Sequence, residues 1–338
     1  MRRRRGRRLG VLVALLLLTP LLTVTVGPAG VPLGDVVGVI ANHVPGLHVT
    51  ATWSPTVEAI VWQTRVPRII GAIAIGAILG IAGVVFQAIV RNSLAEPYVL
   101  GVSAGASFGA AVAMIVVGTI TPWGVGACAF VGALLATVLV LGAGGRHGSP
   151  LRLILGGLGI GFGFQAATNL LVFSSSSPET ARTVLFWTLG SLARVTWGSL
   201  PMLVVVALGM IVLFVFAGPV LDALASGDRT AQSVGIEPAT ARMLLLIPAS
   251  LGVAVAVAAA GGIGFVGLIV PHLLRAVFGH GHRLLVLATA VGAALFLVWA
   301  DAVARIAFAP IELPIGVMTG LVGAPLLVVL VRRLPTHV

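Results

Sequence analysis

The sequence has few charged residues and no lysine. Only 9% of its 338 residues are charged, whereas a soluble globular protein carries about 25%. So few charges cannot cover a surface that faces water, and the composition therefore indicates an integral membrane protein. The absence of lysine excludes a Walker A loop, because that loop needs a lysine to reach the phosphates. If this protein moves anything against a gradient by using ATP, the ATPase is another polypeptide.

Cysteine and acidic residues are also scarce. The single cysteine, Cys128, excludes a disulfide framework, and we expect it to be a small buried apolar residue. The carboxylates Glu58, Glu96, Asp301 and Glu312 fall in loops or at the ends of apolar runs, whereas a proton-driven carrier needs carboxylates inside the membrane. No metal-ligand spacing and no catalytic set is present. The sequence predicts neither an enzyme nor a cofactor bound by this chain.

Long apolar runs fill most of the chain. A spanning helix needs about 20 predominantly apolar residues, and such runs occur at 9–26, 66–90, 98–118, 123–143, 151–173, 199–219, 240–261, 263–278, 284–305 and 314–331. We therefore predict an all-α polytopic membrane protein with about ten transmembrane helices. The boundary at Gly261-Gly262 is the least certain, since the two runs there could form one broken element. The basic, then apolar, N-terminus is also typical of a secretory signal peptide, but its length favours an uncleaved first helix.

The arginines predict the orientation. Cytoplasmic loops retain basic residues, and the basic N-terminus therefore belongs in the cytoplasm. Ten spans then place the C-terminus and the loops 91–97, 144–150, 220–239 and 279–283 there as well. Fifteen of the twenty arginines lie inside, and five lie outside, namely Arg65, Arg68, Arg182, Arg194 and Arg305. Because the charges interrupt apolar runs and form no basic stripe, the net charge of +11 does not indicate a nucleic-acid partner.

The whole chain, 1–338, is predicted to be one transmembrane domain. It comprises a basic cytoplasmic tail at 1–8, external segments at 27–64 and 174–198, and a cytoplasmic segment at 220–239. Trp187 and Trp197 flank a short amphipathic stretch, which is typical of an interfacial helix. Small-residue faces such as Gly76-x-x-x-Gly80 predict close packing between helices.

Five strings in the chain resemble, in the same order, signatures of the permease subunits of ABC importers for iron–siderophore, haem and vitamin B12. They are "RVPRIIGAIAIGAILGIAGVVFQAIVRNSLAEPYVLGVSAGASFGAAVA" (65–113), "FWTLGSL" (186–192), "GGIGFVGLIVPHLLR" (261–275), "ADAVARIAFAPIELPIG" (300–316) and "GAPLLVVLVRR" (323–333). The resemblance implies ten spans with both termini inside, and a pair of permeases, either two copies or two paralogues, in the cytoplasmic membrane of a bacterium. It also implies two ATPase subunits that use ATP and Mg²⁺ on the inner side, and a substrate-binding protein on the outer side.

By the same resemblance, Arg65, Arg68 and Arg305 would dock acidic residues of the binding protein. Arginine suits this role because its planar fork holds a carboxylate bidentately and keeps its charge. We expect Arg65 and Arg68, with Pro67 between them, to project outward as a stiff pair, so that replacing both by Glu weakens docking and leaves folding intact. The alternative role is interfacial snorkelling, which we favour for Arg182 and Arg194.

The segment 220–239 resembles the family's coupling segment, in which two short helices rest in a groove of the ATPase. We expect a short helix from Asp228 to Gln232, with Gly235 as its left-handed stop. The residues predicted to contact the ATPase are Asp228, Arg229, Gln232, Ser233, Gly235 and Ile236. The alternative is a solvated loop with no partner.

The sequence therefore predicts a permease that moves a ferric siderophore by alternating access, with haem and cobalamin as alternatives within the family. Outside the family, the alternatives are an ion-coupled secondary transporter and a membrane scaffold without transport. The resemblance places the path at the axis of the permease pair, with walls from the fifth and tenth spans. The residues predicted to line it are Gln165, Asn169, Met318 and Thr319.

Overall fold

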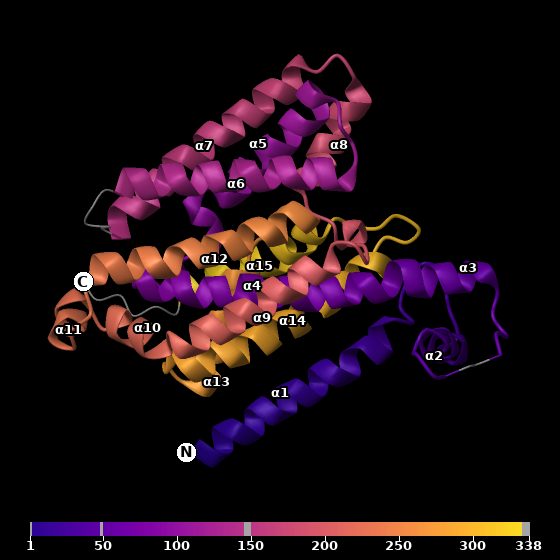
Figure 1. Cartoon of the computed structure of the whole chain (residues 1–338), viewed down its shortest axis with the longest axis horizontal. Coiled ribbons are helices and arrows are strands. Elements are labelled where there is room, and N and C mark those ends of the chain that lie inside the picture. The colour runs from indigo at the N-terminus through magenta and orange to yellow at the C-terminus, as the bar shows by residue number, and fades with distance from the viewer. Residues whose placement is uncertain (1, 48–49, 145–149, 333–338) are drawn as a thin grey trace.

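The computed structural model describes residues 2–47, 50–144 and 150–332, and this part of the chain is helical without any β-strand (Figure 1). Residues 145–149 and the C-terminal residues from 333 onward, which were predicted to be cytoplasmic, are not among the described residues. The α-helices are α1 (Arg2–Thr23), α2 (Leu33–Asn42), α3 (Pro55–Glu58), α4 (Val66–Val90), α5 (Val102–Ala111), α6 (Pro122–Gly144), α7 (Pro150–Ser174), α8 (Pro178–Thr188), α9 (Leu200–Phe216), α10 (Gly218–Ala225), α11 (Asp228–Ser233), α12 (Pro238–Ala260), α13 (Val266–Phe278), α14 (His282–Ile306) and α15 (Ile315–Arg332). Short π-helical and 3₁₀ turns are η1 (Ala59–Arg65), η2 (Pro97–Leu100), η3 (Val112–Val117) and η4 (Leu192–Arg194).

A helix forms at each of the ten predicted spans, but not all of these helices are long enough to cross a bilayer. Within the described residues, six helices are long and apolar enough to span, and a seventh results if α9 and α10, bent by 61°, count as one span. Helix α13 has 13 residues, or about 20 Å, against a hydrocarbon core of about 30 Å. The polytopic all-α class is confirmed, while the count of ten and the sidedness of the termini stay predictions.

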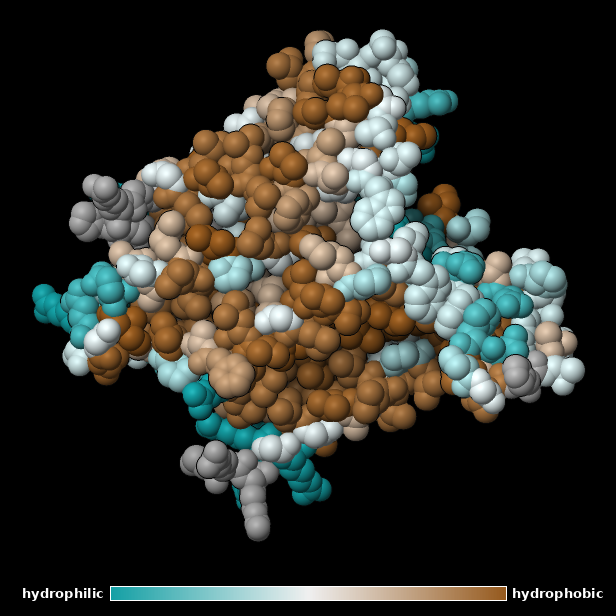
Figure 2. All heavy atoms as spheres, viewed as in Figure 1, coloured by the Kyte–Doolittle hydropathy of each residue, from teal (hydrophilic) through white to brown (hydrophobic). Residues whose placement is uncertain are grey.

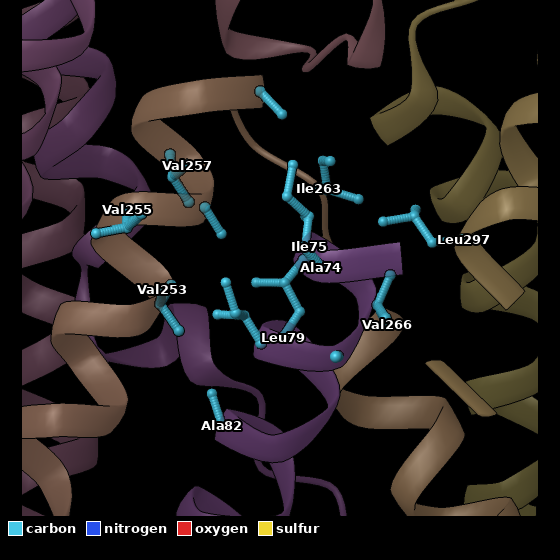
Figure 3. Packing of buried hydrophobic residues seen from close by; sticks show 14 of the residues in the cluster. Ala74, Ile75, Leu79, Ala82, Val253, Val255, Val257, Ile263, Val266 and Leu297 are labelled. Carbon is cyan, nitrogen blue, oxygen red and sulfur yellow. The ribbon is translucent and has the colours of Figure 1, made fainter. Parts of the chain in front are cut away.

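Helix α4 is the centre of the larger helix group and is buried along nearly its whole length. It packs on α9, α12, α13 and α14. Figure 3 shows Ile75 and Leu79 of α4 between the valines of α12 and Leu297 of α14. A Cβ on Gly76 would lie 2.6 Å from the carbonyl oxygen of Ala293. The predicted glycine face therefore allows α4 and α14 to approach backbone to backbone.

Helices α5, α6, α7 and α8 form a second group, which meets the first where α6 packs on α12 (Figure 1). Gly105 and Gly109 of α5 face Gly132 and Cys128 of α6, whose carbonyl oxygens would lie 2.4 and 2.0 Å from an added Cβ. The predicted small-residue packing is confirmed here too. Cys128 is half-buried in this contact and has no disulfide, in line with its predicted packing role.

The two ends of the bundle each collect one set of arginines. Arg91, Arg229, Arg242, Arg275 and Arg283 belong to the end that carries α10 and α11, whereas the five arginines predicted outside belong to the opposite end. Figure 2 shows apolar side chains across the middle of the visible face and hydrophilic side chains toward its ends. This segregation agrees with the predicted sorting of the arginines into two groups.

The uncertain boundary at Gly261-Gly262 is a break between α12 and α13 that extends to Phe265, whose φ is +68°. Two side chains from the turn after α4 bind the free backbone N–H groups of this break. The Tyr98 hydroxyl accepts from Ile263 N at 3.0 Å, and Glu96 Oε1 accepts from Phe265 N at 2.5 Å. Non-helical backbone inside a membrane protein requires such partners. The stretch 91–98, which lies within the first recognised string, thus serves a structural purpose.

The prediction of an interfacial helix between Trp187 and Trp197 is wrong about the position of the helix. Helix α8 begins after its N-cap Ser177 and ends at Thr188, so it precedes the stretch, which is a turn with only the short η4. Trp187 is buried, and Trp197 donates to the backbone oxygen of Trp62 at 2.7 Å. Gly190, with φ +74°, ends the helix early because it turns the chain into the left-handed region.

Candidate functional site

An ion cluster lies at the end of the bundle opposite α10 and α11. Arg68 holds Asp301 with Nε at 3.0 Å and Nη2 at 2.9 Å, and holds Glu312 with Nη1 at 2.7 Å. Arg305 Nε lies 3.2 Å from the second oxygen of Asp301. Arg65 completes the cluster beside Arg68. Arg68 and Arg305 contact the two carboxylates, and with Arg65, which binds backbone oxygens, the cluster carries one net positive charge.

Arg65 and Arg305 also bind the turn that follows α1. Arg65 donates to the carbonyl oxygens of Val24 at 2.7 Å and of Ala29, and Arg305 donates to Val26 at 2.7 Å. Arg305 also donates to Thr23 O at 3.1 Å, a carbonyl of the last turn of α1 that the helix itself leaves without a partner. The arginine pair predicted to open the second span and the arginine about 240 residues away are therefore brought together, and they tie α1, α4 and α14 to one another.

The prediction that Arg65 and Arg68 project outward is wrong. The side chains of Arg65, Arg68 and Arg305 are only 2–5% exposed, because carboxylates and backbone oxygens on neighbouring segments surround them. Replacing Arg65 and Arg68 by Glu would bring four carboxylates together at a buried site, so the structure argues against the expectation that folding stays intact, which no measurement tests. Docking through these arginines is untested and stays a prediction.

The sequence reasoning missed the partners Asp301 and Glu312. Asp301 is placed inside α14 and is 1% exposed, although it was expected at the end of a span. Its spacing of four residues from Arg305 is that of a helical ion pair and could have indicated the contact. Glu312 lies in the connection from α14 to α15, and no local pattern relates it to Arg68.

Three of the five recognised strings meet at a backbone junction near this cluster. Ser191 N donates to Ala260 O at 2.7 Å, Ile315 N to Gly190 O at 3.1 Å, and Gly316 N to Leu189 O at 3.0 Å. A Cβ on Gly190 would lie 2.3 Å from Gly262 O. Both this close approach and the positive φ of residue 190 require a glycine at that position.

At the opposite end, α10 and α11 form the two short helices expected in 220–239. Helix α11 covers the predicted helix, and Gly235 has φ +80°. The N–H groups of Gly235 and Ile236 donate back to Gln232 O and Ala231 O, at 3.0 and 2.9 Å, which closes the helix as predicted.

The residues predicted to contact an ATPase differ in exposure. Arg229, Gln232, Ser233 and Gly235 are exposed, whereas Asp228 and Ile236 are half-buried. Asp228 accepts from the buried Arg242 of α12 and lies 3.5 Å from Arg91 after α4. Asp228 therefore fastens α11 to α4 and α12, while the exposed four residues leave a surface open for a partner.

The four residues predicted to line the path do not form one site in the single chain. Gln165 and Asn169 lie on an exposed face of α7, where Gln165 Nε2 donates to Asn169 Oδ1 at 3.0 Å. Met318 on α15 lines a shallow apolar hollow with Trp299 and Val322. Thr319 is fully buried and donates to Gly316 O at 3.2 Å. Their role in a path stays a prediction.

Residues 15–333 match the model of the FecCD transport family, which is 94% of the chain's length by those bounds and includes the ion cluster, the backbone junction and α10–α11. The chain belongs to this family. It is 37% identical over 277 residues to the vitamin B12 import system permease protein BtuC of Salmonella typhi, covering 82% of this chain and 84% of that protein. The BtuC proteins of Salmonella newport and Salmonella enteritidis match to the same extent.

Two solved structures resemble the fold. One is a metal-chelate type ABC transporter in an inward-facing conformation, with a TM-score of 0.84 and 31% identity, over 97% of this chain and all of that chain. The other is PsaBC from Streptococcus pneumoniae in complex with Fab, with a TM-score of 0.55 and 18% identity, over 78% of this chain and 90% of that chain; it supports the fold alone. The predicted family is confirmed.

This FecCD-family chain is therefore the membrane permease component of an ABC importer and not its ATPase. Membership in this family implies ATPase and substrate-binding partners and a paired permease. It is a multi-pass protein of the inner membrane, as the apolar helices and its relatives indicate.

Proposed function

We propose that this permease carries a bulky metal chelate inward, with a ferric siderophore as its cargo. The observation that carries the proposal is the likeness along 97% of the chain, at a TM-score of 0.84, to a transporter described as metal-chelate type. Translocation by alternating access follows if the cargo and the ATPase favour different packings of the helices.

Vitamin B12 is the second candidate, and the 37% identity to BtuC proteins favours it. Both cargoes are large metal chelates, so the same helix bundle suits either. We would reconstitute the permease with its ATPase and binding protein and measure uptake of radiolabelled ferric siderophores, haem and cobalamin. Saturable uptake of a siderophore that excess cobalamin does not inhibit is the expected result. Uptake of cobalamin alone would contradict the siderophore cargo and leave the importer function standing.

The exposed amide pair on α7 supports a path or a subunit contact along this helix. Gln165 and Asn169 lie among exposed apolar residues such as Phe162 and Phe173. Amide groups that face lipid are costly, so this face is better suited to a paired permease or to a water-containing path. We propose that α7 borders the path and that Met318 of α15 borders it from the other side.

We also propose that the end of the bundle with the ion cluster receives an acidic binding protein. The cluster has one excess positive charge, and Glu312 is its most accessible carboxylate, with 36% of its side chain exposed. Glu312→Gln removes this competing charge without unpairing Asp301. We expect the substitution to increase the affinity of the binding protein about two- to fivefold at low salt, since exposed charge pairs contribute roughly 0.2–1 kcal/mol.

Surface plasmon resonance with the permease–ATPase complex in nanodiscs measures this affinity. The effect should shrink at high salt, because salt screens exposed charges. An unchanged affinity for Glu312→Gln at low salt would mean that the binding protein docks elsewhere.

A further inference from the structure

The end of the bundle that carries the ion cluster also contains a cavity, which is separate from the residues proposed for docking, coupling and the path. A mainly apolar cavity of about 560 Å³ opens among the ends of α6, α9 and α12, with walls that include Met114, Phe130, Leu203, Val255 and Ala258. Its volume is in the range of ligand sites, roughly 300–1,000 Å³. None of the residues predicted for docking, coupling or the path lines this cavity.

Arg194 is the charged residue in the cavity wall. Its Cζ lies 5.7 Å from the centroid of the Trp187 ring, and its Nη1 makes a long bond of 3.4 Å to Trp187 O. Within residues 2–47, 50–144 and 150–332, no carboxylate lies at ion-pair distance from it. Burial lowers the pKa of Arg194 to about 10, so the side chain keeps its charge at neutral pH. A partly desolvated cation without a counter-ion is costly, and an anionic ligand would remove that cost.

The cavity lies where α6 and α9 begin and α12 ends, so its position corresponds to the edge of the apolar bundle. Trp123 stands at its rim and is 70% exposed, as is typical of tryptophan at the lipid headgroup level. Ile120 and Met202 extend the apolar surface beside it. The apolar interior with a single cation therefore matches a molecule that has an acyl chain and an anionic head.

We propose that this cavity binds one anionic phospholipid, with an acyl chain between α6, α9 and α12 and its phosphate on Arg194. The guanidinium fork suits a phosphate because it donates two parallel hydrogen bonds. Arg182 offers a matched control, since it also lies beside an aromatic ring, 5.4 Å from Phe186, but is exposed on α8 and does not line the cavity.

Native mass spectrometry of the full-length chain, delipidated in detergent, tests the proposal with phosphatidylglycerol and phosphatidylcholine as probes. Wild type should retain phosphatidylglycerol about tenfold more strongly than phosphatidylcholine, because both lipids carry a phosphate but the choline cation of phosphatidylcholine offsets that charge and repels the Arg194 guanidinium. Arg194→Gln should abolish this preference, and Arg182→Gln should preserve it. Equal retention of the two lipids by wild type, or an equal loss in both variants, would overturn the proposal.

Two further measurements separate a lipid from a free anion. Ala258→Phe fills the cavity and should reduce retention of both lipids, whereas inorganic phosphate at millimolar concentration should not displace phosphatidylglycerol. Displacement by phosphate alone would show a simple anion site and overturn the proposal. If Ala258→Phe fails to fold, the rise in melting temperature on adding phosphatidylglycerol replaces it, and this rise should be present in wild type and lost in Arg194→Gln.

Discussion

At the scale of single residues, Asp301 holds the ion cluster together. It contacts both Arg68 and Arg305, and all three side chains are at most 5% exposed. Removing one partner of a buried ion pair leaves an uncompensated charge. The cluster is therefore more sensitive to the loss of its buried carboxylate than to the loss of Glu312, which is partly exposed.

We predict that Asp301→Asn destabilises the permease by about 3 kcal/mol, the lower part of the range for broken buried pairs, because Glu312 can still neutralise Arg68. Glu312→Gln should cost less than about 1 kcal/mol. Thermal unfolding in detergent, followed through the tryptophan fluorescence, compares the two variants. Equal melting temperatures would refute the assigned importance of Asp301.

Gly190 is the second residue on which a local structure depends. Gly190→Ala would force a Cβ to within 2.3 Å of Gly262 O and strain a backbone at φ +74°. We predict a loss of at least about 1–2 kcal/mol from the left-handed conformation alone. Gly209→Ala in α9 is the matched control, since no heavy atom lies within 4 Å of its added Cβ. The same unfolding assay should show a lower melting temperature for Gly190→Ala only.

At the scale of elements, the sequence predicted the helices better than their ends. A long apolar run identifies a helix in a membrane protein, because the backbone must satisfy its own hydrogen bonds where no water is present. Each of the ten runs contains a helix. The 61° bend after α9 falls at Gly218-Pro219, a pair that marks turns but was read as part of the run at 199–219. Helix α13 is shorter than a span because Glu96 and Tyr98, far away in the sequence, bind the break before it. Such long-range partners leave no trace in a local pattern.

The sequence predicted helix α11 correctly, because Gly235 and the polar run before it are local signals. It did not predict that Asp228 attaches α11 to Arg91 and Arg242. We predict that Asp228→Asn loosens α11 and lowers the amount of substrate transported per ATP up to about fivefold, the effect of a partly exposed ion pair, without preventing assembly with the ATPase. The ratio of uptake to phosphate release in proteoliposomes measures this. Glu237→Gln, which removes the charge of an exposed carboxylate close to α11 and outside the residues predicted to contact the ATPase, should keep the ratio near wild type; an equal drop in both variants would contradict the attachment role.

At the scale of the whole molecule, composition alone indicated a membrane protein, and ordered motifs indicated the FecCD family. The three arginines of the candidate site were predictable from the sequence, whereas their carboxylate partners Asp301 and Glu312 and the burial of the cluster were not. Arg65, Arg68 and Arg305 were correctly grouped, but their burial depends on Asp301, Glu312 and the turn after α1, which only the folded chain brings together.

The central claim, that this chain imports a substrate by using the ATPase of a partner, is tested most directly by uptake into proteoliposomes. Vesicles would contain the permease with its ATPase, the binding protein and a radiolabelled metal chelate outside, and ATP or a non-hydrolysable analogue inside. The account predicts saturable uptake that needs ATP, the ATPase and the binding protein, and that an imposed proton or sodium gradient does not replace. Uptake driven by such a gradient in vesicles that contain the permease alone would contradict it.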